Sequence, residues 1–255
     1  MRKPVFTPTI FVLAAVSCFG SRLVYSQTLV TAQRVPFTVV KSTSVEEDGV
    51  FLTATYAFRA DGSEVVFPAK PGDPYPPHRS VIDVPSRMMY SIDPASKTFH
   101  AERMTLRHLR KQTTFYKRCE DIYGAPNATV SCSPTDESVL GHRLFRVLST
   151  TSLNDGTRFE SEYWAAPDLN FYPLAEKKSL SGDFRNENLA LSVTVGEPDP
   201  AWFEVPVGYQ QVQLLSEFVV RADAARGRKV SADSESMRAL DESMRRRQAE
   251  VEAGR

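Results

Sequence analysis

Apolar and polar residues alternate from residue 50 to residue 58, which is the pattern of a strand with one face against a core. The dipeptide Asp61-Gly62 follows, and both positions of a tight two-residue turn favour residues that tolerate positive φ. A second apolar run ends at Phe67. These features predict an antiparallel hairpin over residues 50–67. Its apolar face would carry Val50, Leu52, Ala54, Tyr56 and Phe58.

A two-residue turn also predicts the register of this hairpin. It places Arg59 opposite Glu64, so that opposite charges meet. It places Tyr56 opposite Phe67, so that large apolar side chains meet on one face. By the same register, Phe58 would lie opposite Val65.

A second hairpin is predicted from two apolar runs, residues 144–148 and 159–164, with Asp155-Gly156 between them. A two-residue turn at this dipeptide would place Leu148 opposite Tyr163, and Val147 opposite Trp164. Both of these pairs are apolar, as expected for strands that share a core.

The rest of the body of the chain also reads as β structure. Five prolines between residues 68 and 77 exclude a central strand there and predict a surface loop. Residues 102–118 fit either a helix or a strand. Short strands are expected over residues 80–84, 87–92, 97–101 and 189–195. We therefore expect residues 36–205 to form an antiparallel β protein.

The C-terminal segment has a different character. Residues 221–255 contain nine basic and seven acidic residues among 35, and no aromatic residue. Val230, Met237, Met244 and Val251 recur every seven residues, but Asp233 and Arg247 interrupt a coiled-coil seam. The pattern predicts a solvated helix or tail, and the alternative is a helix that docks on a partner.

The N-terminus resembles an export signal. Arg2 and Lys3 precede a short apolar run, residues 10–16, which is too short to span a membrane. Cleavage before Gln27 would remove residues 1–26, and the alternative is an uncleaved anchor. Cys18 lies in a sequence that loosely resembles the box at which bacterial lipoproteins are lipidated.

Two cysteines, Cys119 and Cys132, remain after cleavage at this site. An even pair in an exported chain predicts a disulfide. In the chain-entropy model, closing a loop of this length stabilises the fold by about 3 kcal/mol. A catalytic thiol pair is not expected, because no Cys-x-x-Cys spacing occurs.

Charge and motifs argue against several classes of function. The 31 basic and 31 acidic residues balance, whereas nucleic-acid binders normally carry a basic excess. The sequence has no zinc-binding His-Glu-x-x-His, no Gly-x-Ser-x-Gly and no glycine-rich phosphate loop. Glu160 and Glu162 form a weak carboxylate pair on one strand face. We expect no enzyme activity, no metal and no cofactor, with a hydrolase as the alternative.

One stretch, residues 103–118, carries six basic residues and no acidic residue. Arg107, Arg110 and Lys111 lie at its centre and would contact an anionic surface such as lipid head groups. The alternative is a basic face that acidic residues elsewhere in the fold balance.

Four short motifs resemble those of a group of exported bacterial proteins that are largely uncharacterised. They lie at residues 90–98, 139–141, 162–169 and 203–209. The order of hairpins in that group resembles the lipoprotein-carrier (LolA/LolB-like) superfamily. The resemblance covers roughly residues 80–210. It implies a mainly β (α+β) fold, a curved antiparallel half-barrel sheet with a few helices, to which the C-terminal charged helix is added.

These expectations give a domain plan and a site. Residues 1–26 are expected to be a signal peptide, 27–210 a β-rich half-barrel domain, and 211–255 a C-terminal helix or charged tail. The concave face of a half-barrel would bind an acyl chain or another apolar ligand, since each buried CH₂ contributes about 0.8 kcal/mol. Its expected lining is Tyr56, Phe58, Phe67, Leu148 and Tyr163, which would equally form an ordinary packed core.

The alternative function is an envelope sensor or scaffold that binds a protein partner through its sheet and through residues 221–255. In both cases the mature protein is expected in the periplasm or outside the cell, with no transmembrane span. Lipidation of Cys18 would instead place it at the outer membrane. Neither nucleic acid nor a cofactor is expected as a ligand, and the sequence leaves the ligand and the oligomeric state open.

Overall fold

A computed structural model gives the structure of the protein. It describes residues 34–45, 50–69, 78–113, 119–123, 128–152, 158–180, 184–229 and 235–253. The chain divides into two units, Met1–Val30 and Thr31–Arg255, and all the described residues belong to the second unit. The predicted signal peptide, Cys18, the Asp155-Gly156 turn and most of the proline-rich loop lie outside the described residues.

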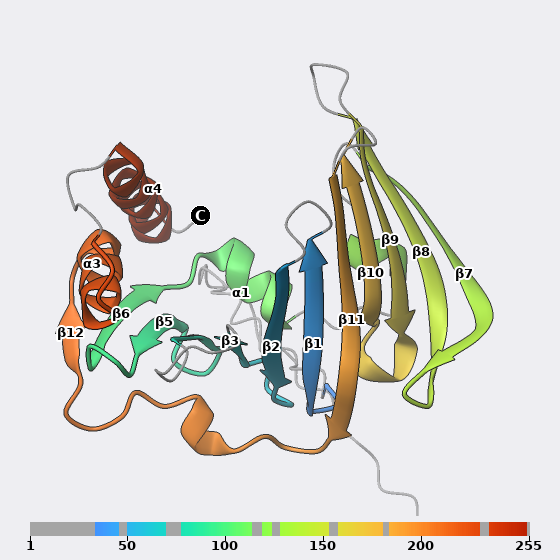
Figure 1. The fold of residues 1–255 in the computed structure, drawn as a ribbon, viewed down its shortest axis with the longest axis horizontal. Coiled ribbons are helices and arrows are strands. Elements are labelled where there is room, and N and C mark those ends of the chain that lie inside the picture. The colour runs from blue at the N-terminus through green and yellow to red at the C-terminus, as the bar shows by residue number, and fades with distance from the viewer. Residues whose placement is uncertain are drawn as a thin grey trace, which may run out of the picture. The chain divides into compact units, whose positions relative to one another are not determined.

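Twelve strands form one curved sheet (Figure 1), in the order β12-β6-β5-β4-β3-β2-β1-β11-β10-β9-β8-β7. Neighbouring strands are antiparallel, except for β12 and β6, which are parallel. Among the described residues, the edge strands β12 and β7 do not pair with each other, so the sheet is unclosed. The predicted fold class, a mainly β half-barrel with few helices, is confirmed.

The strands are β1 (Phe37–Val45), β2 (Val50–Phe58), β3 (Glu64–Ala69), β4 (Arg79–Asp83), β5 (Met88–Asp93), β6 (Thr98–Arg103), β7 (Ala128–Val139), β8 (His142–Ser152), β9 (Arg158–Ala166), β10 (Tyr172–Leu180), β11 (Phe184–Val195) and β12 (Gln210–Val212).

The hairpin of β2 and β3 forms as predicted, but its register differs by one residue. Arg59 lies opposite Ser63 rather than Glu64, because the loop contains three residues and not two: the amide of Arg59 donates to the carbonyl of Ser63 at 2.9 Å. The third loop residue, Gly62, has a φ of 89°. Tyr56 therefore pairs with Val66, Phe58 pairs with Glu64, and Phe67 pairs with Thr55. Because a slip of one residue reverses the face of every side chain, Phe67 lies on the face opposite Tyr56.

The hairpin of β8 and β9 differs from its prediction in the same way. Ser152 pairs with Arg158, so five residues, 153–157, lie between the paired strands instead of two. Val147 consequently lies opposite Tyr163, and Leu148 lies opposite Glu162. The predicted pairing of Leu148 with Tyr163 was wrong, and these two residues are on different faces of the sheet.

The segment that fitted a helix or a strand is divided between them. β6 ends at Arg103, and α1 (Leu106–Thr113) begins three residues later. The hydroxyl of Thr105 accepts a hydrogen bond from the amide of His108 at 3.2 Å, as at the N-cap of a helix. Leu109 is buried with Met104 and Val84, which holds α1 against the sheet.

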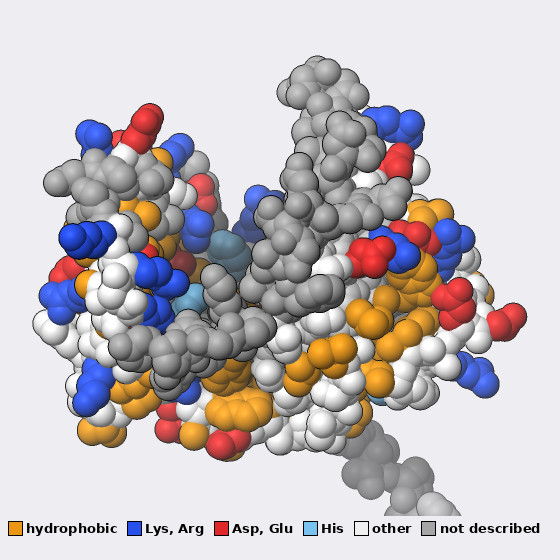
Figure 2. All heavy atoms as spheres, in the orientation of Figure 1, with side chains coloured by type: hydrophobic (Ala, Val, Ile, Leu, Met, Phe, Trp, Pro, Cys, Tyr) orange, Lys and Arg blue, Asp and Glu red, His pale blue; other side chains and the backbone are white. Residues whose placement is uncertain are grey.

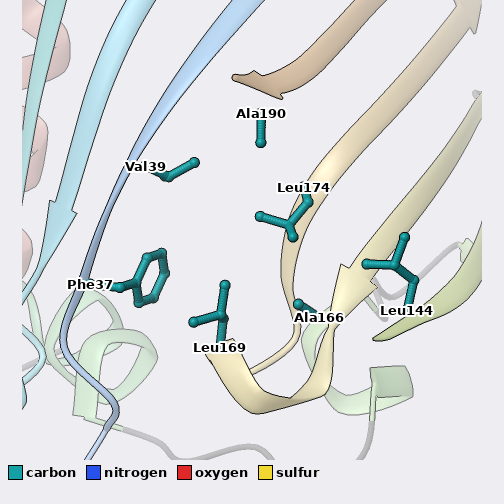
Figure 3. Close-up of a cluster of buried hydrophobic side chains, with 7 residues drawn as sticks. All are labelled: Phe37, Val39, Leu144, Ala166, Leu169, Leu174 and Ala190. Carbon is teal, nitrogen blue, oxygen red and sulfur yellow. The ribbon is translucent and has the colours of Figure 1, made fainter. Parts of the chain in front are cut away.

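Two clusters of apolar side chains form the main core. The cluster in Figure 3 joins β1 to the strands β8–β11 through Phe37, Val39, Leu144, Ala166, Leu169, Leu174 and Ala190. On β2 and β3, the residues that lie on the other face of the sheet belong to a second cluster. There Ala57 and Val65 pack with Phe203, which comes from the segment that connects β11 to β12.

The C-terminal segment is helical and contacts the sheet (Figure 1). α3 (Leu215–Ala225) ends beside Arg226, whose guanidinium lies 2.6 Å from the carboxylate of Asp93. α4 (Glu235–Glu252) contacts both α3 and β6. The carboxylate of Asp241 accepts hydrogen bonds from the amide and hydroxyl of Ser216, at 3.1 and 2.6 Å. The predicted C-terminal charged helix is confirmed.

Candidate ligand-binding site

A pocket of about 330 Å³ lies between the sheet, the end of α1 and the corner that joins β9 to β10. It is at the small end of the range for ligand pockets, roughly 300–1,000 Å³. We call it the aromatic pocket. Its lining residues are Arg34, Val35, Phe37, Tyr56, Phe58, Glu64, Lys111, Gln112 and residues 169–173.

Four aromatic side chains form one wall of the aromatic pocket. β1 and β2 pair Phe37 with Phe58 and Val39 with Tyr56, so these residues share a face. The rings of Phe37 and Phe58 stack with their centroids 4.7 Å apart. Tyr172 meets Phe37 and Phe58 edge-on, at 5.3 and 5.0 Å. Such pairs add about 0.5–1.5 kcal/mol each beyond the burial of their area, so the wall is held firmly in place.

The corner between β9 and β10 supplies Tyr172 to this wall. After a short helical turn over Pro167–Leu169, the chain reverses through Asn170 and Phe171, which both have a φ of 56°. This left-handed conformation is uncommon for a bulky residue such as phenylalanine and costs about 1–3 kcal/mol. Backbone strain of this kind clusters at binding sites, and both residues line the aromatic pocket.

Charged residues form the other side of the aromatic pocket. Arg34 donates a hydrogen bond to the backbone carbonyl of Lys111 at 3.3 Å, near the end of α1. Burial raises the pKa of the Glu64 carboxyl, while Lys111, a hydrogen bond with Gln112 and Arg34 act in the opposite direction. The pocket therefore combines an aromatic wall with two cations and one acid that is shifted towards its neutral form.

A buried polar cluster lies next to the aromatic wall. Lys41 of β1 is only 6% exposed, and its ammonium lies 4.8 Å from the centre of the Tyr172 ring. Burial lowers the pKa of Lys41 to about 8, although Glu176 acts to raise it. Glu176 itself bonds to Lys178 and to Asn188, each at 2.6 Å.

The structure brings only some of the expected cavity residues together. Tyr56 and Phe58 line the aromatic pocket. Tyr163 shares their face of the sheet but packs near the disulfide with Cys119 and Val147. The other two residues, Phe67 and Leu148, lie on the opposite face because of the register differences described above.

On that opposite face, Phe67 packs edge-on against Trp202 at 5.2 Å. Leu148 is 42% exposed, and Leu189 and Leu191 are 49% and 51% exposed. Figure 2 shows apolar side chains gathered over the strands β8–β11 in this region. Phe67 therefore contributes to the second core cluster, whereas Leu148 belongs to an exposed apolar surface.

Sequence reasoning missed Phe37, Lys41 and Tyr172. Phe37 and Val39 alternate like the other core positions, so a strand over residues 37–45 could have been predicted. Lys41 continues this alternation, and a lysine at a core-facing position is itself a signal of an unusual site. Tyr172 gave no such signal, because an irregularity between Pro173 and Ala175 breaks the strand period there.

The other predicted features occupy separate places. Arg107, Arg110 and Lys111 are exposed on α1, and Lys111 also lines the aromatic pocket. Cys119 and Cys132 form the predicted disulfide between α2 (Cys119–Tyr123) and β7. Glu162 forms an ion pair with Arg146, and Glu160 lies 4.0 Å from Arg158.

A larger groove, of about 660 Å³, lies between β6 and α4. His100 lines it, and one ring nitrogen, Nδ1, is 3.2 Å from the carbonyl oxygen of Val212. The other, Nε2, is buried and has no hydrogen-bond partner among the described residues. No helix in the described part of the chain is long and apolar enough to cross a membrane.

No protein family model and no curated protein matches the sequence. The chain is similar to solved structures of PNGF-II (TM-score 0.39, 13% identity) and MucB (TM-score 0.42, 16% identity). Each match covers 73% of this chain, but only 32% of PNGF-II and 62% of MucB. A third similar structure is the LolA superfamily protein NE2245 from Nitrosomonas europaea (TM-score 0.33, 7% identity). That match covers 68% of this chain and 90% of NE2245.

Proposed function

We propose that the protein is an exported, non-catalytic envelope protein that binds an apolar ligand, such as an acyl chain, in the aromatic pocket. The observation that carries this proposal is the pocket itself, in which Phe37, Phe58 and Tyr172 form an apolar wall on an unclosed sheet. Burying an acyl chain contributes about 0.8 kcal/mol per CH₂, so an apolar wall suffices for affinity.

Blocking the pocket at its rim tests this proposal without removing a core side chain. Val35 lines the aromatic pocket and is 41% exposed, so Val35→Trp would fill the opening and leave the aromatic wall intact. Val207→Trp is the matched control, because Val207 is fully exposed and does not line the pocket. Titration with a fluorescent acyl chain should give saturable binding to the wild-type and Val207→Trp proteins, and at least tenfold weaker binding to Val35→Trp. Equal affinities in all three proteins, or no binding to the wild-type protein, would contradict the proposal.

The location follows from the proposed signal peptide. A mature chain that begins at Gln27 would be periplasmic or secreted, whereas lipidation of Cys18 would attach it to the outer membrane. Mass spectrometry of the protein from an envelope fraction distinguishes these forms. A mass matching residues 27–255 with one disulfide supports export and cleavage, and a mass that retains residues 1–26 contradicts it.

A second candidate function is binding of a protein partner at the C-terminal helices. The observation that favours it is the groove between β6 and α4, where the buried Nε2 of His100 has no partner among the described residues. A protein partner would bind the full chain and lose affinity when α4 is deleted. Unchanged capture by a chain that ends at residue 234 would contradict this second function.

A further inference from the structure

Among the described residues, no acidic group forms an ion pair with the ammonium of Lys41. Its side chain is buried on β1, and its ammonium lies 4.8 Å from the centre of the Tyr172 ring. Within the described ranges, the Lys41 ammonium forms neither a hydrogen bond nor an ion pair. Buried charges in proteins are normally paired, so an unpaired ammonium is a place where an anion would bind favourably.

Glu176, the acidic residue that interacts electrostatically with Lys41, already has other partners. Glu176 pairs with Lys178 through one carboxylate oxygen and accepts a hydrogen bond from Asn188 through the other, each at 2.6 Å. Thr43 holds Asn188 in turn, with 2.6 Å between its hydroxyl and the amide oxygen. The cluster thus contains two lysines and one carboxylate, and its second positive charge is unbalanced.

Aromatic residues connect this cation to the aromatic pocket. Tyr172 lies over Lys41 and also lines the pocket. On β2, Tyr56 also lines the pocket and is two residues from Ala54, the residue opposite Lys41. At the rim, Arg34 and Lys111 face Glu64, so the charges around the pocket favour an anion.

We propose that the ligand is an anionic amphiphile, an acyl chain that ends in a carboxylate or a phosphate. The acid group binds the ammonium of Lys41, and the chain packs against Phe37, Phe58 and Tyr172. This inference rests on the binding function proposed above and adds the class of head group.

The test compares ligands that share one chain and differ in the head group. Dodecanoic acid, dodecyl phosphate and dodecanol would be titrated into the full mature protein at neutral pH, below the critical micelle concentration of each acid and below the solubility limit of the alcohol. A charge-assisted hydrogen bond predicts that at least one acid binds about tenfold more tightly than the alcohol. The acid with the larger preference identifies the head group as carboxylate or phosphate.

Lys41→Met tests whether this lysine recognises the acid, because methionine keeps an unbranched side chain and removes the charge. The preference for the acid should disappear, while the affinity for dodecanol should remain. Lys177→Met is the matched control: Lys177 also lies over a ring, 6.0 Å from the centre of Trp164, but its side chain is 58% exposed. This variant should keep the wild-type preference.

The outcomes separate the two proposals. If the wild-type protein bound the alcohol and both acids equally, the anionic head group would be excluded and the apolar site would stand. If none of the three ligands bound, the proposed function itself would fail. A preference that survived in Lys41→Met would assign the acid to another cation and overturn the role of Lys41. Should Lys41→Met not fold, Lys41→Gln would replace it, and the wild-type comparison would still decide the ligand class.

Discussion

A buried ion pair joins the C-terminal segment to the sheet. Asp93 is fully buried on β5, and the side chain of Arg226 is 7% exposed. One oxygen of Asp93 lies 2.6 Å from the guanidinium, and the other accepts hydrogen bonds from the amide and hydroxyl of Ser96, at 2.8 and 2.7 Å. Burial alone would raise the pKa of Asp93, but these hydrogen bonds outweigh it and lower the pKa. The pair is thus fully satisfied, and each member depends on the other.

Arg226→Leu should lower the free energy of unfolding by about 3 kcal/mol, because it leaves the Asp93 carboxylate buried without its cation. Urea denaturation at neutral pH measures this change. Arg228→Leu is the control, since Arg228 pairs with Asp223 at 2.6 Å but its side chain is 56% exposed. An exposed pair contributes little, so the control should unfold close to the wild-type midpoint. Equal losses in the free energy of unfolding of the two variants would show that the buried pair stabilises the fold no more than the exposed pair does.

Lys41 illustrates how much of the site the sequence could predict. The alternation along β1 places Phe37, Val39 and Lys41 on one face, so the position of the lysine follows from the pattern alone. Its burial does not follow, because a lysine at the end of an apolar run normally reaches solvent. In the fold, a corner more than a hundred residues away in the chain brings Tyr172 over the ammonium.

The pKa of Lys41 leads to a prediction for stability against pH. It is about 8 in the folded protein and 10.5 in an ordinary setting, because burial penalises the charged form. Below pH 8 both states carry the proton and the folded state bears the whole penalty, about 3 kcal/mol. Between pH 8 and 10.5 the folded state has lost the proton while the unfolded state keeps it, so the penalty disappears.

The wild-type protein should therefore gain stability relative to Lys41→Met as the pH rises through this window. Chemical denaturation of both proteins at several pH values measures the difference, and taking the difference removes most contributions from other groups. Glu176, Lys178 and Tyr56 interact with this region and are present in both proteins. A difference that stayed constant from neutral pH to pH 10.5 would contradict the burial of a titrating lysine.

At the scale of elements, the hairpins were predictable and their registers were not. Alternation and an Asp-Gly dipeptide were enough to identify the β2–β3 hairpin. The same dipeptide is compatible with loops of two or three residues, and the choice between them moves every partner by one. In the loop of three residues that forms, Gly62 lies directly against α1. A β-carbon at this position would be 2.6 Å from the carbonyl oxygen of Gln112.

Gly62→Ala should consequently destabilise the protein by about 2 kcal/mol or more. The φ of 89° is strained for alanine, and the added methyl group would push α1 away from the loop. Gly141→Ala separates the two effects, because Gly141 has a φ of 86° and nothing within 4 Å of the added carbon. Thermal unfolding should show a clearly larger loss for Gly62→Ala. Equal losses of stability in the two variants would mean that the close approach of α1 to Gly62 does not add to the cost of the substitution.

At the scale of the whole molecule, the composition and the short motifs predicted the fold class, an unclosed antiparallel sheet with few helices. They did not predict how the C-terminal segment completes it. β12 extends the sheet beside β6, and the carbonyl of Val212 lies 3.2 Å from His100. The proposed boundary at residue 210 therefore falls at the start of a strand of the sheet. Two buried groups of the proposed body, Asp93 and His100, have partners beyond that boundary.

Two truncations distinguish a body that ends at residue 210 from one that includes α3. A chain that ends at residue 234 loses α4 but keeps β12, α3 and Arg226. It should unfold cooperatively and bind the acyl ligand with wild-type affinity, because α4 contacts β6 and α3 and does not line the aromatic pocket.

A chain that ends at residue 210 leaves Asp93 without its cation. It should be less stable by at least the loss expected for Arg226→Leu, about 3 kcal/mol. Denaturation and ligand titration of both chains measure these effects. If the chain that ends at residue 210 were as stable as the chain that ends at residue 234, the half-barrel would fold without its C-terminal helices. The role left for α3 and α4 would then be to bind a partner.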